Sequence, residues 1–271
     1  MTVPADQLPE LPAGQTPRSE SEQIPAGFSK EDADLSERLS MVVAADCQYY
    51  FPSPHAVCGA IRDKYNAMGG PGSWLSYPTS PEYQNPGATG ARSEFLNGSI
   101  YWSAATGAHP VTLLYMNKWS QHGWEAGFMG YPTTDEFVNL DNIGSRQEFS
   151  GAAIYWHPLQ SPLTAVIGGA IRDKWNTTGA EIGTLGYPTS DENPLTKYNG
   201  RYNNFTFGAI YWSNITNAHS IDFDVLTLWR LFGAENGHYG YPTTDTSRDS
   251  QFTYWLTQDF EQDNVVAFRP F

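Results

Sequence analysis

The chain repeats itself with a period of 54 to 56 residues. The tripeptide Tyr-Pro-Thr occurs four times, and successive occurrences are 54, 56 and 54 residues apart. A helix-like segment with one aromatic residue, a phenylalanine and a Tyr-Trp pair recur in step with it. A fixed period of this size indicates a repeat architecture in which no copy buries its apolar face alone. The tyrosines of the tripeptide are Tyr77, Tyr131, Tyr187 and Tyr241.

Each copy contains the signals of a short helix and a β-hairpin. Residues 169–179 place Ile171 and Trp175 four apart on one helical face, and Gly179 is suited to a left-handed helix end. The proline of Tyr-Pro-Thr favours an extended conformation before it. An Asn-Gly dipeptide that begins at Asn97 lies between two strand-like runs, which is a strong hairpin signal.

We therefore predict an α+β repeat protein of four units, each with a short helix and a β-hairpin. An aromatic strand precedes the first copy, and Val265 to Phe268 replace the Tyr-Trp pair in the last one. Such unusual ends favour closure into a small β-propeller-like ring over an open solenoid. The predicted repeat domain covers residues 41–271 and follows a flexible acidic tether, residues 1–40. Its units span approximately residues 57–110, 111–166, 167–220 and 221–271.

Composition excludes several classes of partner. The net charge of −14 would repel a nucleic acid backbone. No run of 18 apolar residues is present, so no membrane span is expected. Charged residues make up only 16%, and aromatic residues make up 14%. A polar, weakly charged surface rich in aromatic rings suits carbohydrate, because sugars offer both hydroxyl groups and C–H faces.

The two cysteines, Cys47 and Cys58, have ten residues between them. This spacing matches no tetrahedral zinc pattern, and two thiols alone make a poor zinc site. A local disulfide is favoured over two free buried thiols, and it implies an oxidising compartment. The segment that starts at Met1 lacks the basic and apolar regions of a signal peptide. If the protein is exported, its signal lies outside this sequence.

No recognisable catalytic motif is present. The acidic groups that recur are Asp135, Asp191 and Asp245, with Pro81 in the first copy, and the glutamates that follow them, Glu136 and Glu192, with which Glu82 aligns. These carboxylates could hold a structural calcium ion or bind sugar hydroxyls, or they could cap the turn after Tyr-Pro-Thr. Glycosidases need two carboxylates in different environments, and equivalent repeated acids argue against that asymmetry. His109 and His219 share one repeat position, where loop packing is favoured over a ligand role.

The aromatic residues fall into buried and exposed candidates. The helical tryptophans Trp119, Trp175 and Trp229 are predicted core residues. In the Tyr-Trp pairs, alternation places Trp on the face of a buried isoleucine, so Trp is predicted to be buried and Tyr to be exposed. The candidate stacking platforms for a ligand are therefore Tyr101, Tyr155 and Tyr211, together with the Tyr-Pro tyrosines Tyr77, Tyr131, Tyr187 and Tyr241.

The repeat resembles the LGFP repeat, a unit of about this length. The resemblance covers roughly residues 57–268, and tyrosine stands where the name-giving phenylalanine would be. Ser76 departs from the glycine of the signature. The four signatures are Leu75-Ser76-Tyr77-Pro78, Met129-Gly130-Tyr131-Pro132, Leu185-Gly186-Tyr187-Pro188 and Tyr239-Gly240-Tyr241-Pro242.

This resemblance implies a role in the cell envelope. LGFP repeats occur in actinobacteria that contain mycolic acids, where they follow mycolyltransferase, amidase or other envelope enzyme domains and are thought to anchor them in the wall. We expect a secreted or wall-associated module without catalytic activity or cofactor that binds wall polysaccharide, such as peptidoglycan or arabinogalactan. An envelope enzyme is a further expected partner. The alternatives are an envelope hydrolase with a carboxylate site between repeats and a protein-interaction scaffold.

Overall fold

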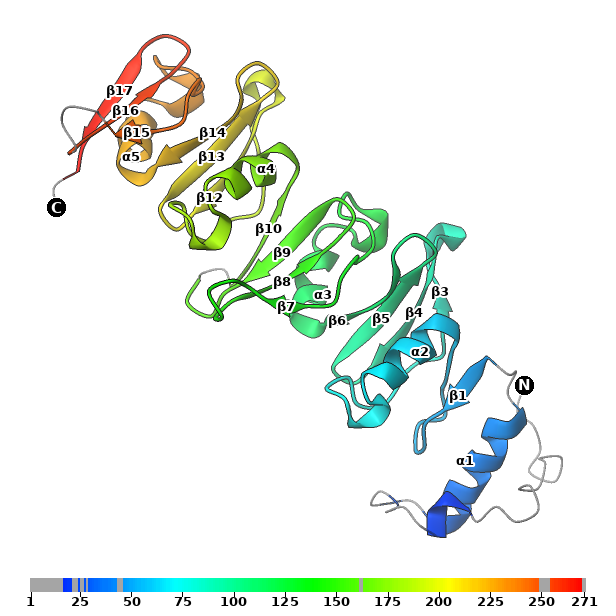
Figure 1. The fold of residues 1–271 in the computed structure, drawn as a ribbon. Helices are drawn as coiled ribbons and strands as arrows, with labels where there is room; N and C mark the ends of the chain where they lie inside the picture. The colour runs from blue at the N-terminus through cyan, green and yellow to red at the C-terminus, as the bar shows by residue number, and fades with distance from the viewer. Residues whose placement is uncertain are drawn as a thin grey trace. The chain divides into compact units, whose positions relative to one another are not determined.

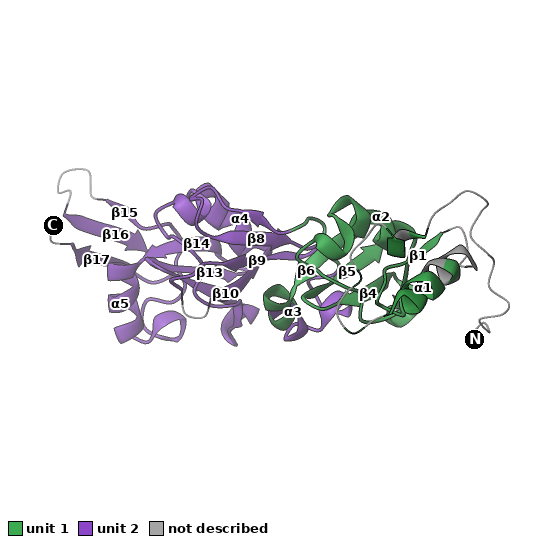
Figure 2. Cartoon of the chain, turned by 90° about the horizontal axis from the view of Figure 1, so that it is seen from below, with its two compact units in different colours: residues 1–117, 131–135 green, residues 118–130, 136–271 purple. Residues whose placement is uncertain are grey.

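The computed structural model contains two compact units of mixed α/β structure (Figure 2). Unit 1 comprises Met1–Asn117 and Tyr131–Asp135, and unit 2 comprises Lys118–Gly130 and Glu136–Phe271. In the part of the chain that the structure describes, no helix has the length and apolar character needed to cross a membrane. The described residues are 17–20, 24, 27, 29–42, 46–160, 163–248 and 254–269.

One order of elements follows each of the helices α2, α3, α4 and α5 (Figure 1). A three-residue 3-10 helix comes first, then a two-residue strand, then a hairpin of longer strands. The described α-helices are α1 (Lys30–Val42), α2 (Gly59–Ala67), α3 (Leu113–Ser120), α4 (Gly169–Thr177) and α5 (Phe223–Leu231).

The strands form small antiparallel sheets in which neighbours in sequence are neighbours in space. The sheets are β1-β2 (Cys47–Tyr49, Ala56–Cys58), β3 to β6 (Tyr83–Gln84, Ala91–Phe95, Gly98–Ser103, Gly107–Thr112), β7 to β10 (Phe137–Val138, Ser145–Glu148, Ala152–Trp156, Thr164–Gly168), β11 to β14 (Asn193–Pro194, Arg201–Phe205, Gly208–Ser213, Asn217–Asp222) and β15 to β17 (Ser247–Arg248, Trp255–Asp259, Asn264–Phe268).

The local sequence predictions hold at the helix and at the hairpin. The helix predicted in residues 169–179 is α4, and Gly179 has the expected left-handed conformation with φ of 97°. The predicted hairpin at Asn97 joins β4 to β5, where Phe95 pairs with Gly98 across a two-residue turn. Short-range turn and cap chemistry therefore fixes the boundaries of these elements.

Trp175 of α4 lies at the centre of a core in unit 2. Its ring is fully buried and meets Tyr155 of the preceding sheet edge to face, with 4.9 Å between the ring centroids. Phe205 of the following sheet lies on its other side at 5.7 Å, and the indole Nε1 donates a 3.0 Å hydrogen bond to the carbonyl oxygen of Gly186. Helix α4 contacts β10 as well as β13 and β14, so it is packed between two sheets.

The same arrangement recurs at α5 and in unit 1. Trp229 lies between Tyr211 and Phe260, with centroids 4.7 and 5.4 Å away, and its Nε1 bonds to the carbonyl oxygen of Gly240 at 3.0 Å. In unit 1, Tyr65 of α2 takes this place and donates its hydroxyl to the carbonyl oxygen of Ser76. Trp119, Trp175 and Trp229 are all fully buried, which confirms their prediction as core residues.

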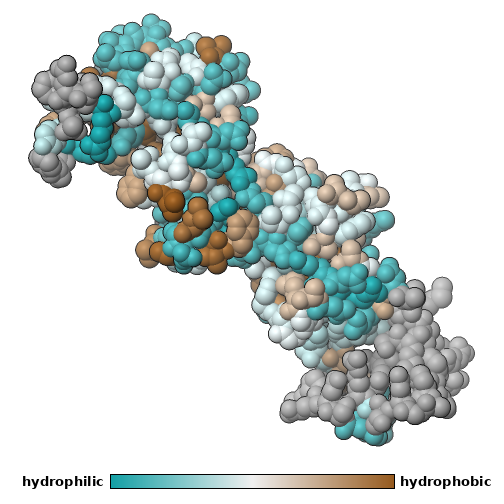
Figure 3. Space-filling view, viewed as in Figure 1, coloured by the Kyte–Doolittle hydropathy of each residue, from teal (hydrophilic) through white to brown (hydrophobic). Residues whose placement is uncertain are grey.

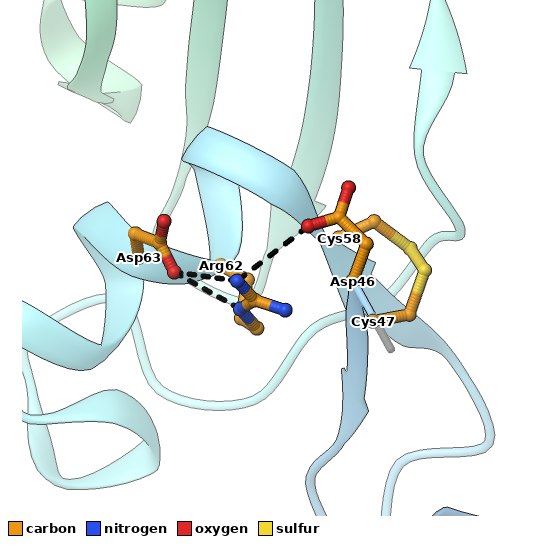
Figure 4. Close-up of a disulfide and its surroundings, with 5 residues drawn as sticks. All are labelled: Asp46, Cys47, Cys58, Arg62 and Asp63. Atoms are coloured by element: carbon orange, nitrogen blue, oxygen red, sulfur yellow. Dashed lines mark hydrogen bonds and ion pairs between the residues drawn. A yellow bond between two sulfur atoms is a disulfide. The ribbon is translucent and has the colours of Figure 1, made fainter. Parts of the chain in front are cut away.

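The predicted disulfide between Cys47 and Cys58 is present (Figure 4). The two cysteines face one another across the β1-β2 pair, which precedes α2. Beside them, Arg62 of α2 binds the Asp63 carboxylate at 2.8 Å and lies 3.6 Å from that of Asp46. The disulfide therefore closes the short sheet that packs against the first repeat helix.

Other predictions are only partly answered. The helical turns expected near residues 30–39 coincide with α1, whereas residues 1–16 of the predicted tether lie outside the described residues. The strand predicted from residue 44 begins at Cys47, and residues 43–45 also lie outside them. Strand β17 pairs only with β16 in the described part of the chain. A closed ring is thus not shown, and it stays a prediction.

Replacing Ser76 by glycine should stabilise the protein. Ser76 has φ of 60°, in the left-handed region, where Gly130, Gly186 and Gly240 stand in the other copies. A side chain costs about 1 kcal/mol in this conformation, so Ser76→Gly should raise the free energy of unfolding by about that amount in urea denaturation. The same change at Ser73, where φ is −75°, should lower it. Equal effects at both serines would contradict this account.

Candidate functional site

The tyrosines of the Tyr-Trp pairs are buried, so the expectation that they are exposed is wrong. Tyr101, Tyr155 and Tyr211 are 3 to 4% exposed. In unit 2, Tyr155 and Tyr211 point at the helical tryptophans Trp175 and Trp229. Side chains alternate between the two faces of a strand, and one face is polar only where it is solvated. Here a helix covers the face that was expected to be solvated.

The tryptophans of the same pairs were predicted to be buried, and they are half-buried. Trp102, Trp156 and Trp212 are all partly exposed, and Trp102 and Trp212 also pack against core residues. Each is the last or second-to-last residue of its strand. The aromatic surface available to a ligand in the Tyr-Trp pairs is therefore that of tryptophan.

The Tyr-Pro tyrosine Tyr187 is buried in unit 2 and fills a space against the preceding copy. It is 6% exposed, and its hydroxyl group donates a 2.7 Å hydrogen bond to the Asp141 carboxylate and accepts one of 3.2 Å from Asn139 Nδ2. Both partners lie in the loop between β7 and β8, in the preceding copy. The Asn139 Oδ1 atom is in turn bound by Arg146, whose guanidinium lies 4.4 Å from the ring centre of the half-exposed Phe137.

Tyr131 and Tyr241 are bound in the same way within their own units. In unit 1, the Tyr131 hydroxyl accepts a 3.0 Å hydrogen bond from Asn85, and in unit 2 Tyr241 donates one of 2.7 Å to the Lys197 carbonyl oxygen. A Cβ atom on Gly90, Gly144 or Gly200 would lie within 2.7 Å of the hydroxyl of Tyr131, Tyr187 or Tyr241, respectively. These glycines leave the space that each tyrosine fills. Tyr77, in the first copy, is half-buried.

The recurrent aspartates form ion pairs with a lysine of the preceding copy. In unit 2, Asp191 lies 3.0 Å from Lys118 Nζ, and Asp245 lies 2.7 Å from Lys174 Nζ. In unit 1, Asp135 lies 2.5 Å from Lys64 Nζ. The predicted roles as turn cap or ligand site did not include this arrangement. Asp191 and Asp245 also accept hydrogen bonds from backbone amides of the edge strands β10 and β14.

A histidine accompanies each of these pairs. His109 Nδ1 lies 2.8 Å from Asp135, His122 Nε2 lies 3.0 Å from Asp191, and His219 Nδ1 lies 3.5 Å from Asp245. His122 comes from the residues after α3, whereas His109 and His219 belong to β6 and β14. The same Asp–Lys–His group is therefore assembled from different positions in the sequence.

These interactions lower the pKa of two of the aspartates. Burial raises the pKa of Asp245, but the nearby His219 ring, Lys174 and the hydrogen bond from the Ser220 amide outweigh it, and the pKa lies well below its usual range. For Asp135, burial is likewise outweighed by His109 and Lys64, and the pKa is lowered. Both carboxylates are therefore held in the ionised form.

The described residues contain no cluster of three or more His, Cys, Asp or Glu side chains suited to a metal ion. Each recurrent aspartate faces a lysine cation instead. The lysines Lys64, Lys118 and Lys174 were missed, although the sequence carries a signal for them. They keep the repeat spacing, and the fourth helix, whose own Tyr-Pro-Thr at Tyr241 is the last in this sequence, has Leu228 at that place.

A shallow pocket of about 350 Å³ opens beside Trp102 in unit 1. The cross-strand register aligns Gln84, Ala91 and Trp102 in one row, and Glu82 and Thr89 complete the polar part of the lining. Burial, together with the nearby Asp46 carboxylate, raises the pKa of Glu82. The pocket combines an indole with carboxyl, amide and hydroxyl groups, which can form both stacking contacts and hydrogen bonds.

The family model of the LGFP repeat matches residues 75–127, 129–183 and 185–237. The chain belongs to the LGFP repeat family. Each matched LGFP repeat starts at the Tyr-Pro signature and runs through one sheet into the next helix. A search of curated proteins gave no match. In the LGFP repeats that start at residues 129 and 185, the signature tyrosine and the following aspartate bind the preceding copy.

Removing the Tyr187 hydroxyl should destabilise the LGFP array. Tyr187→Phe removes the hydrogen bonds that Asn139 Nδ2 and Asp141 Oδ2 make to the Tyr187 hydroxyl in a confined site. We expect a loss of about 1–2 kcal/mol in the free energy of unfolding, measured by urea denaturation. Tyr77→Phe is the matched control, because no hydrogen bond to its hydroxyl is found among the described residues, and it should change stability by less than about 0.5 kcal/mol.

Acid should weaken the LGFP array through Asp135 and Asp245. The folded-state pKa of each lies below the unfolded value of about 3.9, so their stabilising contribution is present above that value and is lost as pH falls through the folded-state pKa. Solvent screens the effect, because both side chains are 42% exposed. Asp245→Asn should therefore flatten the fall in melting temperature below pH 5, and an unchanged slope would contradict this.

Proposed function

We propose that the chain is a secreted, non-catalytic module that binds cell-envelope polysaccharide such as peptidoglycan or arabinogalactan. The observation that carries the proposal is the pocket beside Trp102, where an indole stands among Glu82, Gln84 and Thr89. Sugars are bound by this combination of an aromatic surface and hydrogen-bonding side chains. Membership of the LGFP repeat family and the disulfide, which suits an oxidising compartment, also support it.

The repeat supplies further surfaces of the same kind. Trp156 and Trp212 occupy the position of Trp102 and are also half-buried, and Glu136 and Glu192 occupy that of Glu82. We propose that the sheet after α5 is a fourth, divergent copy beyond the three matched repeats. Weak sites on a repeated scaffold reinforce one another on a repetitive polymer, so shallow pockets are sufficient for firm attachment.

The outer face in Figure 3 agrees with a polymer-binding surface. Teal and white residues cover most of it, and brown apolar residues gather in small areas. A binding role is favoured over hydrolysis at the recurrent aspartates, because each of the three faces lysine and histidine side chains and none is a free carboxylate.

Sedimentation with purified cell walls tests the binding role. The wild-type protein should sediment with the walls, and soluble wall glycan should compete. Failure to sediment would contradict the proposal, and release of reducing sugar or peptide would support a hydrolase instead.

A variant of the pocket tests the site. Glu82→Gln combined with Gln84→Ala should weaken binding of a short glycan fragment about tenfold, because two hydrogen-bonding groups are lost. Calorimetry with a short fragment avoids the masking effect of several sites on one polymer. The matched control is Glu31→Gln with Gln121→Ala, which makes the same changes at exposed positions far from the pocket in sequence. Equal affinity of both variants would exclude the pocket.

A further inference from the structure

The last sheet of unit 2 is one strand short. Gln258 pairs with Val265 as Asn203 pairs with Ile210, so β16 and β17 correspond to β12 and β13. Strand β13 pairs on its other side with β14, whereas β17 is the outermost strand of its sheet among the described residues. The strand that completes the equivalent sheets is thus not present there.

The backbone of β17 directs hydrogen-bonding groups outward. Arg269 N donates to the Tyr254 carbonyl oxygen, and Phe260 N donates to that of Asp263, both at 2.9 Å. Backbone direction alternates along an antiparallel strand, so the amide and carbonyl groups of Val266 and Phe268 point away from β16. In the described residues, no strand or side chain binds these outward groups.

The corresponding edges of the earlier sheets in unit 2 are capped. The Val166 amide of β10 donates to Asp191 at 2.8 Å, and the Val166 carbonyl oxygen accepts from Asn203 at 3.0 Å. The Ser220 amide of β14 donates to Asp245 at 2.9 Å. Each cap comes from the copy that follows. For β17, no such cap is found in the described part of the chain.

Apolar side chains surround this open edge. Val266 is 45% exposed, Phe268 is 54% exposed, and Trp255 is 41% exposed. Trp255 occupies the position of Gly200, which in the preceding copy leaves space for the next Tyr-Pro tyrosine. A following Tyr-Pro tyrosine would therefore meet a tryptophan side chain where the preceding copy has glycine, which argues against another LGFP copy stacking here.

We propose that β17 pairs with β17 of a second copy of this chain. An antiparallel arrangement centred on Val266 places Asn264 opposite Phe268 and aligns the outward groups as narrow pairs, with up to about four hydrogen bonds, because the Asn264 amide already donates to the Asp263 carboxylate. The result is one six-stranded sheet that continues the existing ladder and brings both Trp255–Phe268 ring pairs to one face. Residues 264–268 carry no charge, so the usual protection of an edge strand is missing.

Sedimentation velocity of the 271-residue chain over a range from about 1 to 100 µM tests the proposal. We expect a concentration-dependent dimer, as for a reversible symmetric contact. Val266→Lys places two like charges opposite one another and should raise the dissociation constant at least about tenfold. Val138→Lys makes the same change on the exposed edge strand β7 and should leave the dimer unchanged.

Cross-linking supplies a second readout that does not depend on the lysine variants folding well. Opposed residues in a narrow antiparallel pair lie about 5.5 Å apart between Cα atoms, within reach of a disulfide. Val266→Cys should therefore form a covalent dimer on mild oxidation, and Val138→Cys should not. A wild-type monomer throughout the concentration range, or equal cross-linking of the two variants, would overturn the proposal.

Discussion

The fold depends on one aromatic side chain in each repeat helix that two sheets bury together. Trp175 and Trp229 contact a tyrosine of the sheet before and a phenylalanine of the sheet after, and Tyr65 repeats this in unit 1. Truncating such a residue costs about 3–5 kcal/mol, a large part of the 5–15 kcal/mol that stabilises a typical domain. An exposed ion pair contributes about 0–1 kcal/mol. Aromatic burial therefore contributes far more to stability than the Lys–Asp pairs do.

The residues that join neighbouring copies occur as pairs. Where the sequence lacks one partner of a pair, it also lacks the other. Lys64, Lys118 and Lys174 each precede a copy that contains the partner aspartate, and the last helix has Leu228 instead. Gly90, Gly144 and Gly200 each leave space for the next tyrosine, and Trp255 stands at that place in the final sheet. These correlations within one chain are physical, because each partner is useful only when the other is present.

The residues that recur most strictly are therefore not the surface that meets a ligand. Tyr187 and Asp191 recur because both bind the preceding copy. Tyr187 fills a space there, and Asp191 caps the edge of a strand. The proposed binding surface uses Trp102, which was predicted to be buried, and Glu82, which stands out little in the sequence. The open edge of β17 has the same cause. The following copy supplies the cap of each earlier strand edge, and among the described residues no following copy caps β17.

The sequence by itself determined the repeat, the family, the short helix with its left-handed glycine end, the hairpin and the disulfide, because these depend on neighbours within a few residues or on a period. It also identified the helical tryptophans as core. Only the tertiary structure decided which aromatic rings face solvent and what the aspartates bind. The two faces of a sheet are buried by the helices of two copies. The alternation of residues within one strand does not reveal whether the second helix covers the other face of the sheet.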